Sequence, residues 1–268
     1  MDMVVNTPER SVRPVRTALR VTAVLNALSK SDGKGVSAIS NELGLSKGTV
    51  FGLLRTLELM DYVVQDQTDR SYRLGPAILR IAIRHFQDNN VVSVAHRYLQ
   101  DLADEVGEVV HLGRLEHMSA FFLDRAVGSH VSRILVLDSQ VGAVSPLHCT
   151  SMGKIFLAHM GADGLAEYLG KGPLRRYSHN TIVEEEPLRT ELARIRAQGY
   201  ALNVEEFEEG VSSIAVPVFG AGEKVIAGLN AVMPSFRMPP DRVPTLVSKL
   251  AGIARRIESD LAGQEPPG

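Results

Sequence analysis

Two predicted helices separated by a very short turn constrain the fold of this chain more than any other feature. The stretch NELGLSKGTVFGLLRTLELMDY fills residues 41–62, and the turn within it starts at Gly44. The segment before the turn is expected to be a short helix that Ser37 caps and Gly44 ends. Ser46 can cap the next helix, which we predict over residues 47–60. Two helices joined by a short turn that contains glycine are typical of a helix-turn-helix.

The hydrophobic pattern supports this helix pair. Five apolar side chains fall where the two helices would bury them: Ile39, Leu43, Leu45, Val50 and Leu53. The small residue Ser40 falls where the helices would cross. After the second helix, the polar segment QDQTDR separates two runs of β-forming residues at 62–64 and 71–74, which predicts a hairpin. A hairpin in this place makes the motif a winged helix-turn-helix.

Two glycines lie inside the second helix, where each weakens the helix by about 1 kcal/mol relative to alanine. On a helical projection Gly48 and Gly52 lie opposite the apolar side, together with Arg55. The second helix of such a motif enters the major groove of DNA. We hypothesise that the missing side chains let the helix backbone approach the bases closely. The alternative is that glycines accumulate on the exposed face of a helix-turn-helix that binds no DNA.

Positive charge accompanies the motif. Residues 1–80 hold 11 Lys and Arg against 8 Asp and Glu, whereas the rest of the chain holds 18 against 23. A basic segment joined to an acidic one fits a nucleic-acid module attached to another domain. Arginines beside the first helix and the hairpin are expected to neutralise phosphates, although any one of them can equally be a solvated surface charge. The predicted DNA contacts are Arg13, Arg16, Ser46, Lys47, Gly48, Thr49, Phe51, Gly52, Arg55, Arg70 and Arg73.

The composition excludes several other kinds of site. The single cysteine, Cys149, excludes an intrachain disulfide and any zinc site that needs two thiolates. The eight histidines form no metal-binding pair, so we predict no metal and no cofactor. No apolar run approaches the length of a membrane span, and the N-terminus lacks the apolar core of a signal peptide. A cytoplasmic protein with no membrane partner is therefore expected.

The remaining sequence predicts an α+β domain with an antiparallel sheet. Residues 108–127 alternate as two strands around EHMS, and RILVLD at 133–138 is a third candidate. SSIAVPVF and KVIAGLNAVM are strands joined by GAGE, and SMGKIFLAHM, PLRTELARIRAQG and the segment at 240–263 are helices. At the other end of the chain, a first helix at 14–30 is expected to turn Leu19 toward the core.

Three blocks of sequence resemble the IclR family of bacterial transcriptional regulators, in matching order and spacing. The first is the winged helix, from GVSAISNELG to SYRLG. The second, SPLHCTSMGKIFLA, is similar to a family segment that begins Pro-Leu-His and ends in Gly-Lys. The third, RIRAQGYALNVEEFEEGVSSIAVPVF, is similar to the family's C-terminal signature. The resemblance covers nearly the whole chain. It implies an N-terminal winged helix-turn-helix, a helical linker and a C-terminal GAF-like effector-binding domain.

The resemblance also sets expectations for function. We expect a DNA-binding domain at residues 1–74, a linker helix at 75–90, and an effector-binding and oligomerisation domain at 91–268. It implies a repressor or activator of organic-acid catabolism that binds a palindromic operator in double-stranded DNA as a homodimer or tetramer. A small organic effector would alter operator binding through the linker helix, on which Ile81 lies in a predicted packing face. The family commonly has an arginine where this chain has Gly52, so its operator cannot be deduced from relatives.

The family's effector pocket can be mapped onto this chain. In members that bind small keto acids, a Gly-Ala pair lies against the ligand. In this chain Ser151 and Met152 occupy those two positions. An aspartate of the family falls at Asn203, a cysteine falls at Ser213, and two serines fall at Asn230 and Val232. The predicted effector contacts are Leu137, Ser151, Met152, Asn203, Ser213, Asn230 and Val232. Neutral donors and apolar walls favour a larger ligand, such as an aromatic acid or a neutral derivative, over glyoxylate or pyruvate.

Two other classes of function compete with a ligand-responsive regulator. An enzyme is suggested by the adjacent His148 and Cys149, but neighbouring residues of an extended chain point to opposite sides. The carboxylates of EEFEEG have no partner motif and are expected in a solvated turn, and GAGEK is too short for a phosphate loop. An architectural DNA binder without a ligand has no need of the large acidic second domain. We therefore predict a regulator that is not an enzyme.

Overall fold

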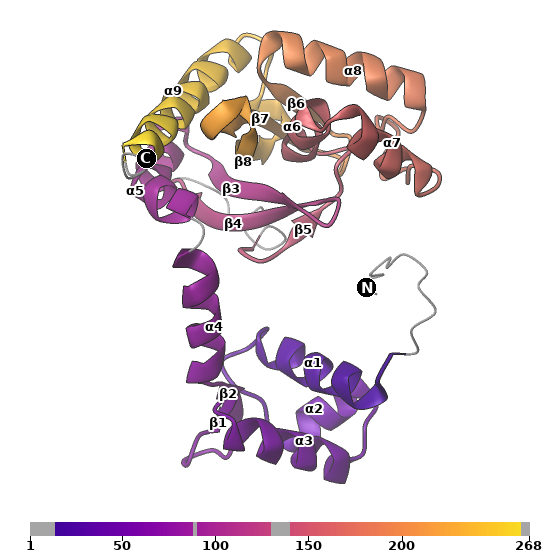
Figure 1. Cartoon of the computed structure of the whole chain (residues 1–268), viewed down its shortest axis with the longest axis vertical. Coiled ribbons are helices and arrows are strands. Elements are labelled where there is room, and N and C mark those ends of the chain that lie inside the picture. Colours follow the sequence, from indigo (N-terminus) through magenta and orange to yellow (C-terminus); the bar gives the residue numbers. More distant parts are fainter. Residues whose placement is uncertain (1–13, 88–89, 130–139, 264–268) are drawn as a thin grey trace. The chain divides into compact units, whose positions relative to one another are not determined.

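The computed structural model describes residues 14–87, 90–129 and 140–263, which form two compact units divided between residues 88 and 89 (Figure 1). Arg13 and Leu137, two of the predicted contacts, lie outside the described residues, as does the predicted strand at 133–138. Within the described ranges, every helix is too short or too polar to cross a bilayer.

The first unit contains the predicted helices and hairpin. Its helices are α1 (Arg16–Leu28), α2 (Val36–Leu43), α3 (Lys47–Leu59) and α4 (Pro76–Gln87), and its strands are β1 (Val63–Gln65) and β2 (Tyr72–Leu74). The two strands pair antiparallel, which confirms the predicted wing. Gly44 adopts a φ of 61°, a left-handed conformation that glycine reaches without strain, and ends α2 there. The N-cap of α2 is Gly35, so the prediction that Ser37 caps this helix is wrong.

The core of the first unit lies between its helices and the hairpin. Its buried members are Val24, Leu28, Ile39, Val50, Leu54, Leu57, Val63 and Tyr72. Ser40 is buried as predicted, and its hydroxyl donates to the carbonyl of Leu45 at 2.6 Å. The prediction is wrong for Leu19, which is 56% exposed. Ile81 on α4 is also 56% exposed, so within this chain it does not lie on a packed face.

The second unit is built on one antiparallel sheet with the strand order β5-β4-β3-β8-β7-β6. The strands are β3 (Val109–Glu116), β4 (Ser119–Val127), β5 (Val144–Ser145), β6 (Ala201–Val204), β7 (Val211–Phe219) and β8 (Val225–Pro234). The helices are α5 (Asn90–Val106), α6 (Ser151–His159), α7 (Ala162–Gly170), α8 (Glu185–Gln198) and α9 (Val243–Ala262). The α+β architecture predicted from the sequence is confirmed.

Helices cover both faces of this sheet (Figure 1). Successive side chains of a strand point to opposite faces, so each strand contributes to two cores. Ile214 and Val216 of β7 join the core under α5 and α9. Ala215, between them, joins the core under α6 and α8. The second of these faces also carries polar residues, as described below.

A glycine fixes the position of α6. A Cβ on Gly153 would collide with the backbone of Leu147. Only glycine therefore lets the first turn of α6 lie this close to the segment before it. Thr150 caps the helix, because its hydroxyl accepts a hydrogen bond from the Gly153 amide at 3.1 Å. Together these contacts set the position of Ser151 over the sheet.

Candidate functional site

The outer face of α3 carries the residues predicted to contact DNA. Gly48 and Gly52 are exposed, and a Cβ at either position would meet no atom within 4 Å. Both glycines therefore face outward, as the helical projection predicts. Lys47 is exposed beside them, and Phe51 is 51% exposed. A glycine-lined strip of helix backbone is thus open to a partner, with a cation and an aromatic ring along one flank.

Polar side chains on this helix are held by local contacts. Ser46 caps α3 as predicted, since its hydroxyl accepts from the Thr49 amide at 3.2 Å. The hydroxyls of the same two residues lie 2.8 Å apart. Arg55 donates to Glu58 at 2.6 Å, yet 58% of the arginine side chain stays exposed. An exposed pair of this kind contributes at most about 1 kcal/mol, so a phosphate can replace the carboxylate at little cost.

The wing presents two further arginines, and a third opens the first helix. Arg70 is exposed and takes a φ of 62° at the turn between β1 and β2. Arg73 forms an ion pair with Asp66. A hydrogen bond from the Thr68 backbone, with the nearby Arg73 charge, holds the pKa of Asp66 below its usual value, so this partner stays ionised. Arg16 is exposed in the first turn of α1.

Three of the predicted effector residues meet on the sheet face beneath α6. The hydroxyls of Ser151 and Ser213 lie 2.8 Å apart, and the amide nitrogen of Asn203 donates to Ser213 at 3.4 Å. The backbone N–H of Glu206 donates to Asn203 Oδ1 at 2.8 Å. This bond orients the amide so that its NH₂ group, a donor, faces the serines. We call Ser151, Asn203 and Ser213 the donor cluster; all three are buried.

The other described effector residues surround the donor cluster. Val232 lies opposite Ser213 in the β7–β8 ladder. Asn230, two residues earlier on the same strand face, has its Oδ1 3.1 Å from His111 Nδ1. Met152 is fully buried, and a Cβ on Gly228 would lie 3.0 Å from the Met152 Cγ. The Met152 side chain therefore packs on the sheet where Gly228 has no side chain. The structure thus brings all six described residues together.

Three buried polar residues near this face were not predicted. His111 lies between Val110 and Leu112, which belong to the core under α5 and α9. Strand alternation could therefore have predicted that His111 points to the other face of the sheet, toward the donor cluster. Lys154 is 1% exposed and donates to Glu206 at 2.5 Å. Glu206 is only 7% exposed, so the prediction that EEFEEG is a solvated turn is wrong at this position. Only the fold brings Glu206 to Lys154, and no local pattern signals their contact.

The neighbouring His148 and Cys149 do not form a catalytic pair. His148 Nε2 lies 2.9 Å from the carbonyl of Arg175, to which it can only donate, and Nδ1 lies 2.9 Å from the hydroxyl of Tyr168. Both ring nitrogens are therefore engaged away from the thiol. Burial, with a smaller contribution from the Glu206 charge, raises the pKa of Cys149 to about 12. A thiol that stays protonated is a poor nucleophile.

We expect Cys149 to resist alkylation in the folded protein. At pH 8, a pKa raised from 9.0 to about 12 lowers the thiolate fraction about a thousandfold, and burial adds a steric barrier. Iodoacetamide labelling followed by mass spectrometry should show reaction in urea and almost none in buffer. Comparable labelling rates in the two solutions would mean that the thiol is accessible and ionised.

Comparisons with known proteins agree with the two units. The family model described as the IclR helix-turn-helix domain matches residues 17–67, and the one described as bacterial transcriptional regulator IclR C-terminal matches residues 84–259. The chain is 30% identical to the HTH-type transcriptional regulator KdgR of Escherichia coli over 253 residues, 94% of this chain and 95% of that one. It is 32% identical to the Pca regulon regulatory protein of Pseudomonas putida over 195 residues, 73% and 66% of the two chains.

A solved structure gives the same picture. A crystal structure of an IclR homolog from Microbacterium hydrocarbonoxydans, complexed with 4-hydroxybenzoate, superposes with a TM-score of 0.77 at 28% identity. The match covers 92% of this chain and 99% of that one. The likeness therefore spans both units of the chain.

Proposed function

The chain belongs to the IclR family of bacterial transcriptional regulators, and from that premise we propose that an aromatic or related organic acid controls its binding to an operator. Members of the family bind DNA and small-molecule effectors and are regulators, not enzymes. The DNA contacts we propose are the exposed residues of α3, the wing arginines and Arg16. The acid occupies the face of the sheet that carries the donor cluster.

The donor cluster is the observation on which the effector class rests. A carboxylate is an acceptor without hydrogens, so it needs donors, and Ser151, Asn203 and Ser213 supply neutral ones. The Glu206 backbone holds Asn203 with its NH₂ toward this cluster. Met152 and Val232 add apolar surface that suits a ring. The relative with bound 4-hydroxybenzoate supports the same class of compound.

We further propose that the active form is a homo-oligomer on a palindromic operator. Large apolar side chains stand exposed on the helices of the DNA-binding unit. Leu19 on α1 is 56% exposed, and Leu79 and Ile81 on α4 are 61% and 56% exposed. Exposed apolar surface of this kind is covered when a second copy packs against it. The linker helix that carries Ile81 would then join effector binding to the spacing of the two winged helices.

Substitution of Asn203 by aspartate tests the effector site. The side chain keeps its size and can still accept the Glu206 amide, but a carboxylate replaces the donor and repels an acid. We expect the affinity for 4-hydroxybenzoate, measured by calorimetry, to fall by about tenfold or more. The same substitution at the exposed Asn41 in α2 should leave the affinity unchanged.

Two outcomes would contradict this assignment. Binding of pyruvate but not of any aromatic acid would show that the site binds short keto acids instead. Undiminished affinity in the Asn203→Asp variant would place the ligand elsewhere. An operator selected from random DNA by the purified protein then tests the regulation. If no acid changes its affinity in a gel-shift assay, the protein is an architectural DNA binder.

A further inference from the structure

An aromatic ring stands on the outer face of α3, apart from the other apolar side chains of that helix's first two turns. Phe51 is 51% exposed. By contrast, Val50 and Leu54 are buried in the core of the first unit, and Leu53 packs against it. Phe51 therefore leaves about half of its surface available to a partner, on the face of the helix that is proposed to contact DNA.

Two cations flank this ring. Lys47 and Arg55 lie four residues before and after Phe51, and residues four apart on a helix share a face, with about 5–6 Å between their Cβ atoms. Lys47 is exposed, as is 58% of the Arg55 side chain. The strip beside this row holds Gly48 and Gly52, which have no side chain to keep a partner at a distance. If the cations hold phosphates, the ring between them is brought close to the bases.

The chemistry of a phenyl ring restricts which base it can recognise. Phenylalanine has no side-chain donor or acceptor, so it cannot pair with the polar groups that the bases present in the major groove. Covering those groups without a hydrogen bond would be costly. Thymine differs from the other bases because its major-groove edge carries an apolar C5 methyl group. This methyl group is the feature of the groove that best complements the Phe51 ring.

Two other roles for an exposed ring fit this helix less well. Apolar wedges between base pairs are used by proteins that bind the minor groove, whereas the second helix of a helix-turn-helix enters the major groove. A contact with a second protein chain would bury Lys47 together with Phe51, and lysine is depleted from the cores of such interfaces. The surroundings of the ring therefore favour a base in the major groove.

We propose that Phe51 recognises a thymine of the operator by packing its ring on the C5 methyl group. The inference rests on the proposed function, since it requires α3 to lie in the major groove. Each half of a palindromic operator would then contain an A·T pair whose thymine methyl contributes to binding. Contacts of the neighbouring cations with phosphates would add affinity but no sequence preference.

The test starts from an operator that the purified full-length protein selects from random DNA. Each thymine is replaced in turn, at the equivalent place in both half-sites, by deoxyuridine, which lacks only the C5 methyl group. A buried methyl group contributes about fourfold to affinity, so its loss from both halves should weaken binding about tenfold at one position. A gel-shift assay measures the change.

Variants of α3 assign the effect to the ring. Phe51→Ala should bind the unmodified operator about tenfold more weakly, and deoxyuridine at the sensitive position should then cause almost no further loss. Phe51→Leu, which keeps an apolar contact, should retain most of the response. Leu59→Ala is the matched control, because Leu59 is an apolar residue of the same helix, 82% exposed and two turns further along. It should respond to deoxyuridine as the unaltered protein does.

Two results would overturn the role of Phe51 alone. One is an operator that tolerates deoxyuridine at every position, and the other is a sensitive position that stays equally sensitive in Phe51→Ala. Circular dichroism of Phe51→Ala checks that the variant is folded, and Phe51→Leu provides the same comparison if it is not. If the unaltered protein selects no operator, the proposed function fails and this inference fails with it, which is a different pattern from the first two.

Discussion

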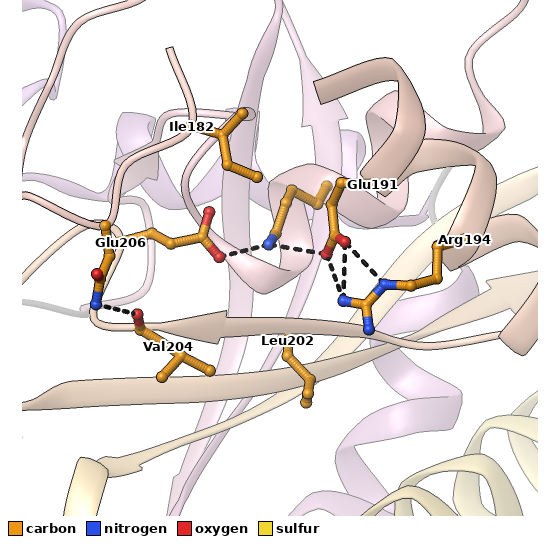
Figure 2. Close-up of a pocket in the computed structure, with 8 residues that line it drawn as sticks. Ile182, Glu191, Arg194, Leu202, Val204 and Glu206 are labelled. Carbon is orange, nitrogen blue, oxygen red and sulfur yellow. Dashed lines mark hydrogen bonds and ion pairs between the residues drawn. The ribbon is translucent and has the colours of Figure 1, made fainter. Parts of the chain in front are cut away.

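Substitution of Lys154 by methionine is expected to lower the free energy of unfolding of the C-terminal unit by about 3–5 kcal/mol. Lys154 is 1% exposed, and its ammonium lies within 3.3 Å of the carboxylates of Glu206 and Glu191. Methionine retains the apolar stem and removes the charge. Glu191 would keep its pair with Arg194 (Figure 2), but the buried Glu206 carboxylate would be left without a cation, which is far more costly than the loss of an exposed pair.

The measurement is urea denaturation followed by circular dichroism, fitted to the transition of the C-terminal unit. Lys171→Met is the matched control, because this lysine is 43% exposed and pairs with Glu167 one turn away. Its loss should cost less than about 1 kcal/mol. The double variant Lys154→Met/Glu206→Gln should recover part of the lost stability, since it removes one stranded charge. A loss near that of the control would show that Lys154 is not needed to neutralise the carboxylates.

The N-terminal unit could be predicted well because its signals are local. The turn requires a left-handed residue, and Gly44 supplies it; the next helix requires a cap, and Ser46 supplies it. Apolar spacing then decides which face of α3 is buried. The error at Leu19 has the same origin: helical spacing places a side chain on a stripe, but it does not tell how far the neighbouring helices extend.

In the C-terminal unit, residues distant in sequence decide the site. Strand β6 has four residues and α7 has nine, and neither gave a pattern strong enough to predict. The contact between Lys154 and Glu206 joins residues 52 positions apart, so a run of glutamates resembled a solvated turn. The positions of the donor cluster came from the family resemblance. The mutual contacts of Ser151, Asn203 and Ser213 required the fold.

Substitution of Gly48 and Gly52 by alanine is expected to change stability and DNA binding in opposite directions. Each substitution should raise the free energy of unfolding of the N-terminal unit by up to about 1 kcal/mol, because alanine favours the helix. No atom lies within 4 Å of either added Cβ, so no steric cost offsets this gain. Operator affinity of the double variant should nevertheless fall about tenfold or more, because two methyl groups would hold the backbone away from the bases.

Gly252→Ala provides the matched control. This glycine lies in α9, and a Cβ there would also meet no atom within 4 Å. It should stabilise its own unit by a similar amount and leave operator affinity unchanged in a gel-shift assay. Lys47→Ala should weaken binding as well and reduce its dependence on salt, since a phosphate contact is lost.

The opposite signs separate the two explanations of the glycines. If they accumulated on an exposed face without a role, alanine would stabilise α3 and DNA binding would stay the same or improve. If the backbone approaches the bases, the more stable protein is the weaker binder. A double variant that gains stability and keeps its full affinity would leave base reading to the side chains alone, with Lys47, Phe51 and Arg55 the exposed groups best placed to do it.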